Sequence, residues 1–439
     1  MGGDEEQYAD PALMRATYAG WHGAAPMGEW FHRAQAGQCI VEGHGARVRD
    51  TAGRWYLDAK AGLWHVTLGY GHPTLVAAIG RQLRTLPAGC LVRGEHPPRV
   101  SVELANALAA RLPAGVRRIR VGTTGSQMVE AAVLLSRCAR VAEGAPQRKE
   151  VVALRDAYHG AGPGAWALTD EPGHHELYGP LLPGVRRADA SLDALEAALA
   201  DTGPERVTAV ILEPIQGSRV ATPSAAYLRG VRELTERHGV HLIVDEVATG
   251  MGRTGAVSLA AELGVVPDLL VLGKGLASGY VPAAALAVSD RIYDLLYDGP
   301  AFAHGSTADG SPLAAAAGLA VLHVLFDEGL LEHVTRIGAV LERGLAQLRD
   351  DIEAVVEVGG AALMQGVRLA DADGALWPLD RMRRLATTCA QAGVLIQTLA
   401  DRIVLVPPFV IDERDCDEIV ETIGSAVAAV ARGREPAHA

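Results

Sequence analysis

The stretch VHLIVDEVATGMGRTG, residues 240–255, followed by DLLVLGKG, residues 268–275, decides how the rest of the chain is interpreted. Each segment contains a short apolar run that ends in charge, the first at Asp245 and the second at Lys274, which stands between two glycines. Runs of this length are typical of buried strands. Ligands of open α/β sheets bind outside the carboxyl ends of the strands, so we expect Asp245 and Lys274 to face one ligand.

The acid and the lysine together predict a specific kind of ligand. A buried carboxylate and a buried ammonium are each unfavourable unless a partner compensates them. A cofactor whose aldehyde takes the Lys274 amine and whose ring nitrogen takes the Asp245 carboxylate fits between them. Desolvation makes a lysine amine neutral and nucleophilic, and a protonated ring accepts electrons from a substrate carbanion. Taken singly, each residue has an ordinary alternative: a surface lysine in a turn, and an aspartate that caps a turn.

A second signal is GTTGSQ, residues 122–127, directly before a predicted long helix. Gly125, Ser126 and Gln127 can offer backbone N–H groups and a hydroxyl to a phosphate at the helix N-terminus. An ordinary serine N-cap is the equally simple alternative. Thr307, in the segment HGST, is a further hydroxyl suited to a phosphate.

Two more predicted strands end in side chains that suit a cofactor ring. Tyr158 closes one of them, and an aromatic ring there can stack on the cofactor, although such a residue is more often part of the core. Glu213 and Gln216 close the next, and the glutamine can hydrogen-bond a phenolic oxygen.

One motif favours a rival interpretation. Residues 250–255, GMGRTG, satisfy the dinucleotide-binding pattern G-x-G-x-x-G and precede a possible helix. In that fingerprint the glycines form the first turn after the strand, whereas here Asp245 and four further residues intervene. Acidic side chains under a pyrophosphate would also repel it, so a nicotinamide-dependent oxidoreductase is only a remote alternative. His174 and His175 lack further ligands at metal spacing, and we expect loop residues there and no metal site.

Composition limits the classes of function. The 439 residues are 49% apolar and 21% charged, with a formal net charge of -12, which argues against nucleic acid or an anionic membrane as a partner. No window approaches the roughly 18 unbroken apolar residues of a membrane span. The five cysteines form no C-x-x-C pair, and the acidic start MGGDEEQYADP does not resemble a signal peptide. We therefore expect a cytoplasmic enzyme.

The order of predicted elements indicates an α/β fold. Strands and helices alternate from about residue 118 to residue 275, which is typical of a mostly parallel sheet with helices on both faces. Residues 39–59 contain two β-rich runs that read as a hairpin or a small meander, and the C-terminal third reads as helices with short strands. We expect residues 1–60 to contribute to a small domain, residues 61–311 to form the large domain, and residues 312–439 to complete the small one.

Together these segments make the chain resemble the class III aminotransferases, pyridoxal-phosphate enzymes of fold type I, and within them the omega-amino acid and amine type. The resemblance runs from AGLWHVTLGYGHP through GTTGSQMVEAA, YHG, EPIQG, DEVATGMGRTG, LGKGLASGYVP and HGSTADGSP to VPPFVI. It implies a seven-stranded-type sheet in the large domain, ping-pong transfer between small-molecule amines and carbonyl compounds, and a homodimer with composite active sites.

The resemblance also implies roles for single residues. Lys274 would hold the cofactor as a Schiff base and later move a proton, and Asp245 would pair with the ring nitrogen. The remaining cofactor contacts would come from residues that enclose the ring or hold the phosphate: Gly125, Ser126, Tyr158, Glu213, Gln216, Val247 and, toward the neighbouring subunit, Thr307.

The chain departs from the family in two places. The usual S-E-A-N-E is here Ser126 to Glu130, SQMVE, which changes the contacts of the phosphate helix. Many omega-transaminases carry an arginine for a substrate carboxylate shortly before the PP segment, and this position aligns with Gln397. Without that bidentate clamp, we expect a neutral or cationic amine, such as an amino sugar, in a pocket walled by Trp64 and Tyr158. An aminomutase or epimerase of the same fold would use the same lysine and acid and stays open as an alternative.

Overall fold

The computed structural model describes residues 19–23, 28, 39–93, 96–299 and 301–432. Its largest element is a seven-stranded sheet with strand order β4-β10-β9-β8-β7-β5-β6. Neighbouring strands run parallel except β10, which is antiparallel to both β4 and β9. In chain order the strands are β4 (Arg118–Gly122), β5 (Glu150–Leu154), β6 (Val185–Ala188), β7 (Val207–Leu212), β8 (His241–Glu246), β9 (Leu269–Leu272) and β10 (Ala284–Val288).

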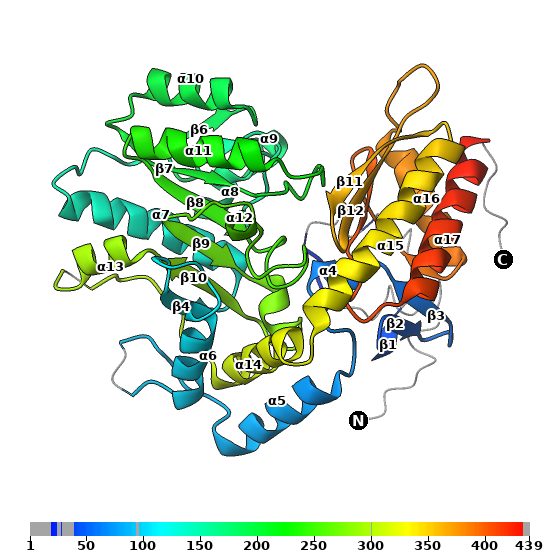
Figure 1. The fold of residues 1–439 in the computed structure, drawn as a ribbon, viewed down its shortest axis with the longest axis horizontal. Helices are drawn as coiled ribbons and strands as arrows, with labels where there is room; N and C mark the ends of the chain where they lie inside the picture. The colour runs from blue at the N-terminus through cyan, green and yellow to red at the C-terminus, as the bar shows by residue number, and fades with distance from the viewer. Residues whose placement is uncertain (1–18, 24–27, 29–38, 94–95, 300, 433–439) are drawn as a thin grey trace.

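Alternate residues of these strands enter two different apolar clusters. Leu242 and Val244 of β8 pack with residues of α11, whereas Ile243 packs with residues of α7. Helices therefore cover both faces of the sheet, as Figure 1 shows, and the expected architecture is confirmed. The helices of this part are α5 (Pro73–Thr85), α6 (Arg99–Ala109), α7 (Gly125–Ala142), α8 (Pro163–Leu168), α9 (Pro172–Tyr178), α10 (Leu192–Thr202), α11 (Ala225–Arg237), α12 (Leu259–Glu262), α13 (Asp290–Leu296) and α14 (Pro312–Phe326), with the 3-10 turn η1 (Lys274–Ala277).

Helix starts follow local sequence rules. Thr124, Ser191, Ser224 and Ser311 each accept a hydrogen bond from a backbone N–H of the first turn of α7, α10, α11 and α14. His174 and His175, expected in a loop, lie instead in α9, where Pro172 begins the short helix.

Two four-stranded sheets and three long helices form the other side of the molecule (Figure 1). One sheet has the order β1-β2-β3-β13, in which the antiparallel meander β1 (Ile40–His44), β2 (Arg47–Asp50) and β3 (Trp55–Asp58) pairs in parallel with β13 (Val394–Leu395). The other has the order β11-β12-β15-β14. Its elements and the helices are β11 (Val355–Ala361), β12 (Met364–Leu369), β14 (Gln397–Leu399), β15 (Arg402–Leu405), α15 (Leu330–Asp351), α16 (Leu379–Gln391) and α17 (Glu413–Ala431).

Of the two alternatives expected at residues 39–59, the meander is the one that forms, and its pairing with β13 joins it to the C-terminal third. The division of the chain at residues 60 and 311 stays a prediction. Residues 1–18, 24–27 and 29–38 of the expected N-terminal segment lie outside the described residues.

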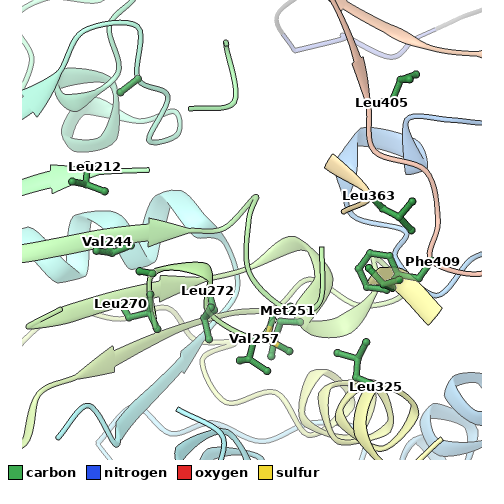
Figure 2. Close-up of a cluster of buried hydrophobic side chains, with 14 of the residues drawn as sticks. Leu212, Val244, Met251, Val257, Leu270, Leu272, Leu325, Leu363, Leu405 and Phe409 are labelled. Atoms are coloured by element: carbon green, nitrogen blue, oxygen red, sulfur yellow. The ribbon is translucent and has the colours of Figure 1, made fainter. Parts of the chain in front are cut away.

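One continuous core supports the carboxyl ends of β8 and β9. Figure 2 shows Leu272 of β9 near Met251 and Val257, with Leu325 and Phe409 beyond them. All of these belong to one buried cluster that extends from the large sheet into the C-terminal elements. Among the described residues no single helix is long and apolar enough to span a membrane, although α14 and α15, bent by 67° to one another, meet that test jointly by length and composition.

Candidate active site

Lys274 stands at the end of a wholly buried strand. β8 and β9 pair in parallel with Asp245 opposite Val271, so their carboxyl ends reach the same edge of the sheet. Burial lowers the pKa of Lys274, and the negative charges of Asp245 and Glu213 oppose that shift without reversing it. The backbone of Lys274 has φ +36°, a left-handed conformation that a non-glycine residue adopts at a cost in energy. The structure thus brings together the predicted acid and amine.

The Asp245 carboxylate is 5% exposed and its two oxygens have different partners. Oδ1 accepts the backbone N–H of Val247 at 3.0 Å, and Oδ2 lies 2.8 Å from Nδ1 of His159. His159 is itself buried, and its Nε2 atom has no hydrogen-bond partner within the described part of the chain. The contact with His159 and the hydrogen bond from Val247 together fix the orientation of the Asp245 carboxyl group.

His159 is a site residue that the sequence does not single out by role. It follows Tyr158 after β5, whereas Asp245 belongs to β8, 86 residues away. Its only sequence signal is its place at the end of a buried strand, which it shares with Tyr158. The contact itself depends on the strand order of the sheet.

The N-terminus of α7 forms a cradle of backbone N–H groups. Ser126 Oγ accepts the N–H of Ala161 at 3.1 Å, so the first turn of α7 is tied to the loop after β5. A Cβ atom at Gly125 would lie 2.8 Å from a methyl group of Val247, and one at Gly160, which has φ +112°, would overlap the Ser126 hydroxyl. Both glycines let the loops approach closely, and the cradle lies beside Val247, two residues from Asp245. A helix N-terminus of this kind suits a phosphate.

Glu213 and Tyr158 are also joined. Glu213 is 8% exposed, and its carboxylate accepts the N–H of Tyr158 at 3.0 Å and the N–H of Gly217 at 3.1 Å. Burial raises the pKa of Glu213 to about 7; His159 opposes this shift and the Asp245 charge adds to it. Tyr158 is 47% exposed, and its ring lies nearly perpendicular to that of Trp166.

Replacing Glu213 with glutamine is expected to favour the folded cofactor-free protein more at high pH than at low pH. The folded-state pKa of about 7 exceeds the ordinary 4.5, so the folded protein loses stability as pH rises between these values. The glutamine side chain does not titrate, so the variant does not lose stability in this way. Between pH 5 and pH 8 the difference in unfolding free energy, variant minus parent, should therefore rise by about 1–3 kcal/mol. Chemical denaturation at both values measures it, and a difference independent of pH would contradict the raised pKa.

Trp64 and Gln397 form one side of the space around the lysine. The Trp64 ring centroid lies 4.7 Å from Lys274 Nζ, and its indole N–H donates to Oε1 of Gln397. Trp64 is 7% exposed and has φ +70°, so its backbone is held in a strained left-handed conformation. The nearby Arg402 gives both guanidinium ends to Glu357, at 3.2 and 3.1 Å, and is 7% exposed. Arg402 therefore does not replace the missing arginine.

Two predicted residues have other surroundings in this chain. Gln216 donates its amide N–H to the carbonyl of Arg155 at 2.7 Å. Thr307 lies on an exposed turn, and no hydrogen bond joins it to another candidate residue within the described ranges. The structure does not bring Thr307 to the other candidates inside one subunit.

The G-x-G-x-x-G segment has a structural role. Arg253 is 1% exposed and donates to the carbonyls of Leu363, at 3.0 Å, and Pro407, at 2.6 Å, while its guanidinium lies over the Phe409 ring. The turn thereby fastens the large sheet to the C-terminal elements. The next helix is only the four residues of α12, whose start is capped by Ser258.

Comparison with known proteins identifies relatives over nearly the whole length. The family model described as aminotransferase class-III matches residues 31–427. An adenosylmethionine-8-amino-7-oxononanoate aminotransferase of Nitratidesulfovibrio vulgaris is 34% identical, over 93% of this chain and 80% of the relative. An omega-aminotransferase of Caulobacter vibrioides is 32% identical, over 87% and 93%. The crystal structure of an amine transaminase from an uncultivated Pseudomonas species in its pyridoxal-phosphate-bound form superposes with a TM-score of 0.88, at 31% identity, over 94% and 99% of the two chains.

Proposed function

The chain belongs to the class III aminotransferase family, and we propose that it transfers an amino group between an amine and a carbonyl compound that carry no carboxylate, such as an amino sugar and its keto form. It is an enzyme of the pyridoxal-phosphate fold type I, with pyridoxal phosphate as its cofactor. The single observation that supports the substrate class is the hydrogen bond from Trp64 to Gln397 at the side of Lys274.

The residues around Lys274 and Asp245 suit this cofactor. We propose that Lys274 binds its aldehyde carbon, that Asp245 binds its ring nitrogen, and that Gly125 and Ser126 hold its phosphate. Val247 and Tyr158 would enclose the ring, Glu213 would position Tyr158, and Gln216 would turn from Arg155 to the ring oxygen. When bound, the cofactor supplies an electron sink for the bond that breaks at the substrate carbon.

The surroundings of Lys274 prepare it to move a proton. Burial lowers its pKa and so increases the neutral fraction of the amine. A neutral amine at Nζ can take the proton from the amine-bearing carbon of the substrate and deliver it elsewhere within reach of the side chain. The Trp64 ring shields one side of Nζ from water, which keeps the amine desolvated.

Gln397 leaves this side of the pocket without a positive charge that could bind a carboxylate. An arginine at this position could form two charge-assisted hydrogen bonds to a carboxylate, whereas the amide has no charge. Its oxygen already accepts the Trp64 indole N–H, which leaves its NH2 group to donate. A hydroxyl or ether oxygen matches that donor, and a carboxylate would be desolvated there without a counter-charge.

The test is a stopped-flow half-reaction of the cofactor-loaded enzyme, followed by its visible absorbance. Amino sugars and simple aliphatic amines should bleach the cofactor at least about tenfold faster than glutamate or alanine at equal concentration, because one unsatisfied buried charge costs about 1.4 kcal/mol or more. Gln397→Arg should raise the rate with amino acids and lower it with amino sugars. Gln391→Arg, on α16, is the matched control and should change neither rate. Fast bleaching of the parent by glutamate would refute the substrate class.

We further propose a homodimer in which Thr307 reaches the cofactor phosphate of the partner subunit, and a cytoplasmic location. The exposed position of Thr307, apart from the other candidates of its own chain, supports the first. An aminomutase or epimerase remains the second candidate activity; net transfer of the amino group to an added acceptor separates it from a transaminase. No observation favours the nicotinamide alternative over the family assignment.

A further inference from the structure

The turn that carries Thr307 is closed by a buried acid. The N–H of Asp309 donates to the carbonyl of Ser306 at 2.9 Å, which places Thr307 at a corner of a four-residue turn. Thr307 itself is exposed, whereas Asp309 is only 2% exposed. The position of Thr307 therefore depends on what holds the Asp309 side chain.

One side chain from α7 and one from β4 hold that carboxylate. Oδ1 accepts the amide N–H of Gln127 at 2.8 Å, and Oδ2 accepts a guanidinium N–H of Arg120 at 3.0 Å. The other end of the Gln127 amide is also fixed, because its oxygen accepts the N–H and the hydroxyl of Thr123 at 3.1 and 2.9 Å. The amide thus donates on one side and accepts on the other, and it cannot be flipped without losing both sets of bonds.

We propose that the Gln127 to Asp309 hydrogen bond positions the Thr307 turn against the N-terminus of α7, so that one contact adjusts the phosphate cradle of one subunit and the hydroxyl offered to the partner. Gln127 lies two residues after Gly125, in the first turn of α7. This inference rests on the proposed cofactor site and dimer. Both side chains act as positioning groups in this proposal, and the backbone N–H of Gln127 donates to the Thr124 hydroxyl at 3.2 Å.

The direction of the hydrogen bond explains the departure from the family pattern at residue 127. The family's usual glutamate would place a second carboxylate at hydrogen-bond distance from Asp309, with no donor between them. Glutamine keeps the acceptor that Thr123 needs and adds the donor that Asp309 needs. The buried Asp309 therefore requires the amide at residue 127.

The bond can be reversed, which gives a sharp test. Cofactor-free protein is titrated with pyridoxal phosphate, and the Kd is taken from the quenching of tryptophan fluorescence, for the parent, Gln127→Glu, Asp309→Asn and the double variant. Gln127→Glu opposes two carboxylates. The asparagine in Asp309→Asn has one oxygen for two donors, so its NH2 group must oppose either the Gln127 amide or the Arg120 guanidinium. Each variant should therefore raise the Kd roughly tenfold. In the double variant the asparagine donates to the glutamate and still accepts from Arg120, so its Kd should return to within about threefold of the parent.

The sign of the Asp309→Asn effect separates this proposal from simple charge repulsion. If only the net charge near the phosphate mattered, removing the Asp309 charge would tighten the binding of pyridoxal phosphate. Disturbing the Gln127–Asp309 contact should instead weaken it. Gln147→Glu, an exposed change of the same charge, is the control and should leave the Kd unchanged. Tighter binding by Asp309→Asn, or a double variant no better than Gln127→Glu, would overturn the proposal.

A second set of variants tests whether the Gln127–Asp309 contact acts through Thr307. Thr307→Ala should weaken binding in the parent and in the double variant, but by a smaller factor in Gln127→Glu, where the turn is already displaced. If Thr307→Ala raised the Kd by the same factor in all backgrounds, the coupling between Thr307 and the Gln127–Asp309 contact would be refuted. If a single variant does not fold, comparing the parent with the double variant still shows whether the reversed hydrogen bond restores binding. A parent that binds no pyridoxal phosphate would instead refute the proposed cofactor site. Normal binding with equal Kd values for the parent, both single variants and the double variant would refute only the proposed role of the Gln127–Asp309 contact.

Discussion

Lys274→Ala is expected to lower the rate of amino-group transfer by about four to six orders of magnitude. In the proposed mechanism the side chain supplies both the covalent attachment and the proton carrier. The chain has only two more lysines, Lys60 and Lys149. Lys149 is exposed on the surface of the molecule. Single-turnover absorbance of the loaded protein with the best amine measures the loss.

The chemistry of the lysine can be tested separately from its effect on folding. Borohydride reduction of the loaded parent should fix the cofactor on the peptide containing Lys274, and mass spectrometry should find Lys60 and Lys149 unmodified. Lys149→Ala is the matched control and should keep full activity. Adding a small primary amine to Lys274→Ala should restore part of the proton transfer, because the cavity left by the side chain admits it. Attachment at another lysine would contradict the assignment.

Asp245→Asn is expected to lower the same rate by about three to four orders of magnitude. The amide has nearly the shape of the carboxylate and can keep its hydrogen bond with His159, but it cannot compensate a positive charge on the ring nitrogen. Without that charge the ring is a weaker electron sink. Steady-state and single-turnover rates with one amine donor measure the effect.

Two comparisons identify the charge as the cause. A cofactor analogue methylated at the ring nitrogen is permanently cationic and should recover a large part of the loss in Asp245→Asn. His159→Gln keeps the Asp245 charge and alters only its orientation, so its rate should fall by about tenfold. If His159→Gln were as damaging as Asp245→Asn, orientation rather than charge would be the main contribution of the pair.

The sequence predicts those parts of the fold that leave local patterns. The apolar runs that end at Asp245 and Lys274 are β8 and β9, and they do meet at one edge of the sheet. The serine and threonine residues before the predicted helices are their N-caps. The antiparallel direction of β10 could not be predicted, because a short buried run such as Ala284–Val288 carries no signal of direction.

Long-range contacts account for the rest of the site. Trp64 and Gln397 can each be identified from their motifs. Their hydrogen bond joins residues 333 positions apart in the sequence, and no sequence periodicity predicts it. The partnership of His159 with Asp245 depends on the strand order, and that of Gln127 with Asp309 depends on how a loop before α14 folds back on β4 and α7. Such contacts follow from topology, which local patterns determine only in outline.

The parallel pairing of β3 with β13 has a consequence for how activity arises during synthesis. Trp64 follows β3 by six residues and Gln397 follows β13 by two, so this pairing brings both halves of the pocket wall to the lysine. The ribosome makes Lys274 and Asp245 more than a hundred residues before Gln397. A nascent chain can therefore assemble the strands proposed to hold the cofactor while the wall proposed to select the substrate is still missing, and on this proposal selectivity is acquired last.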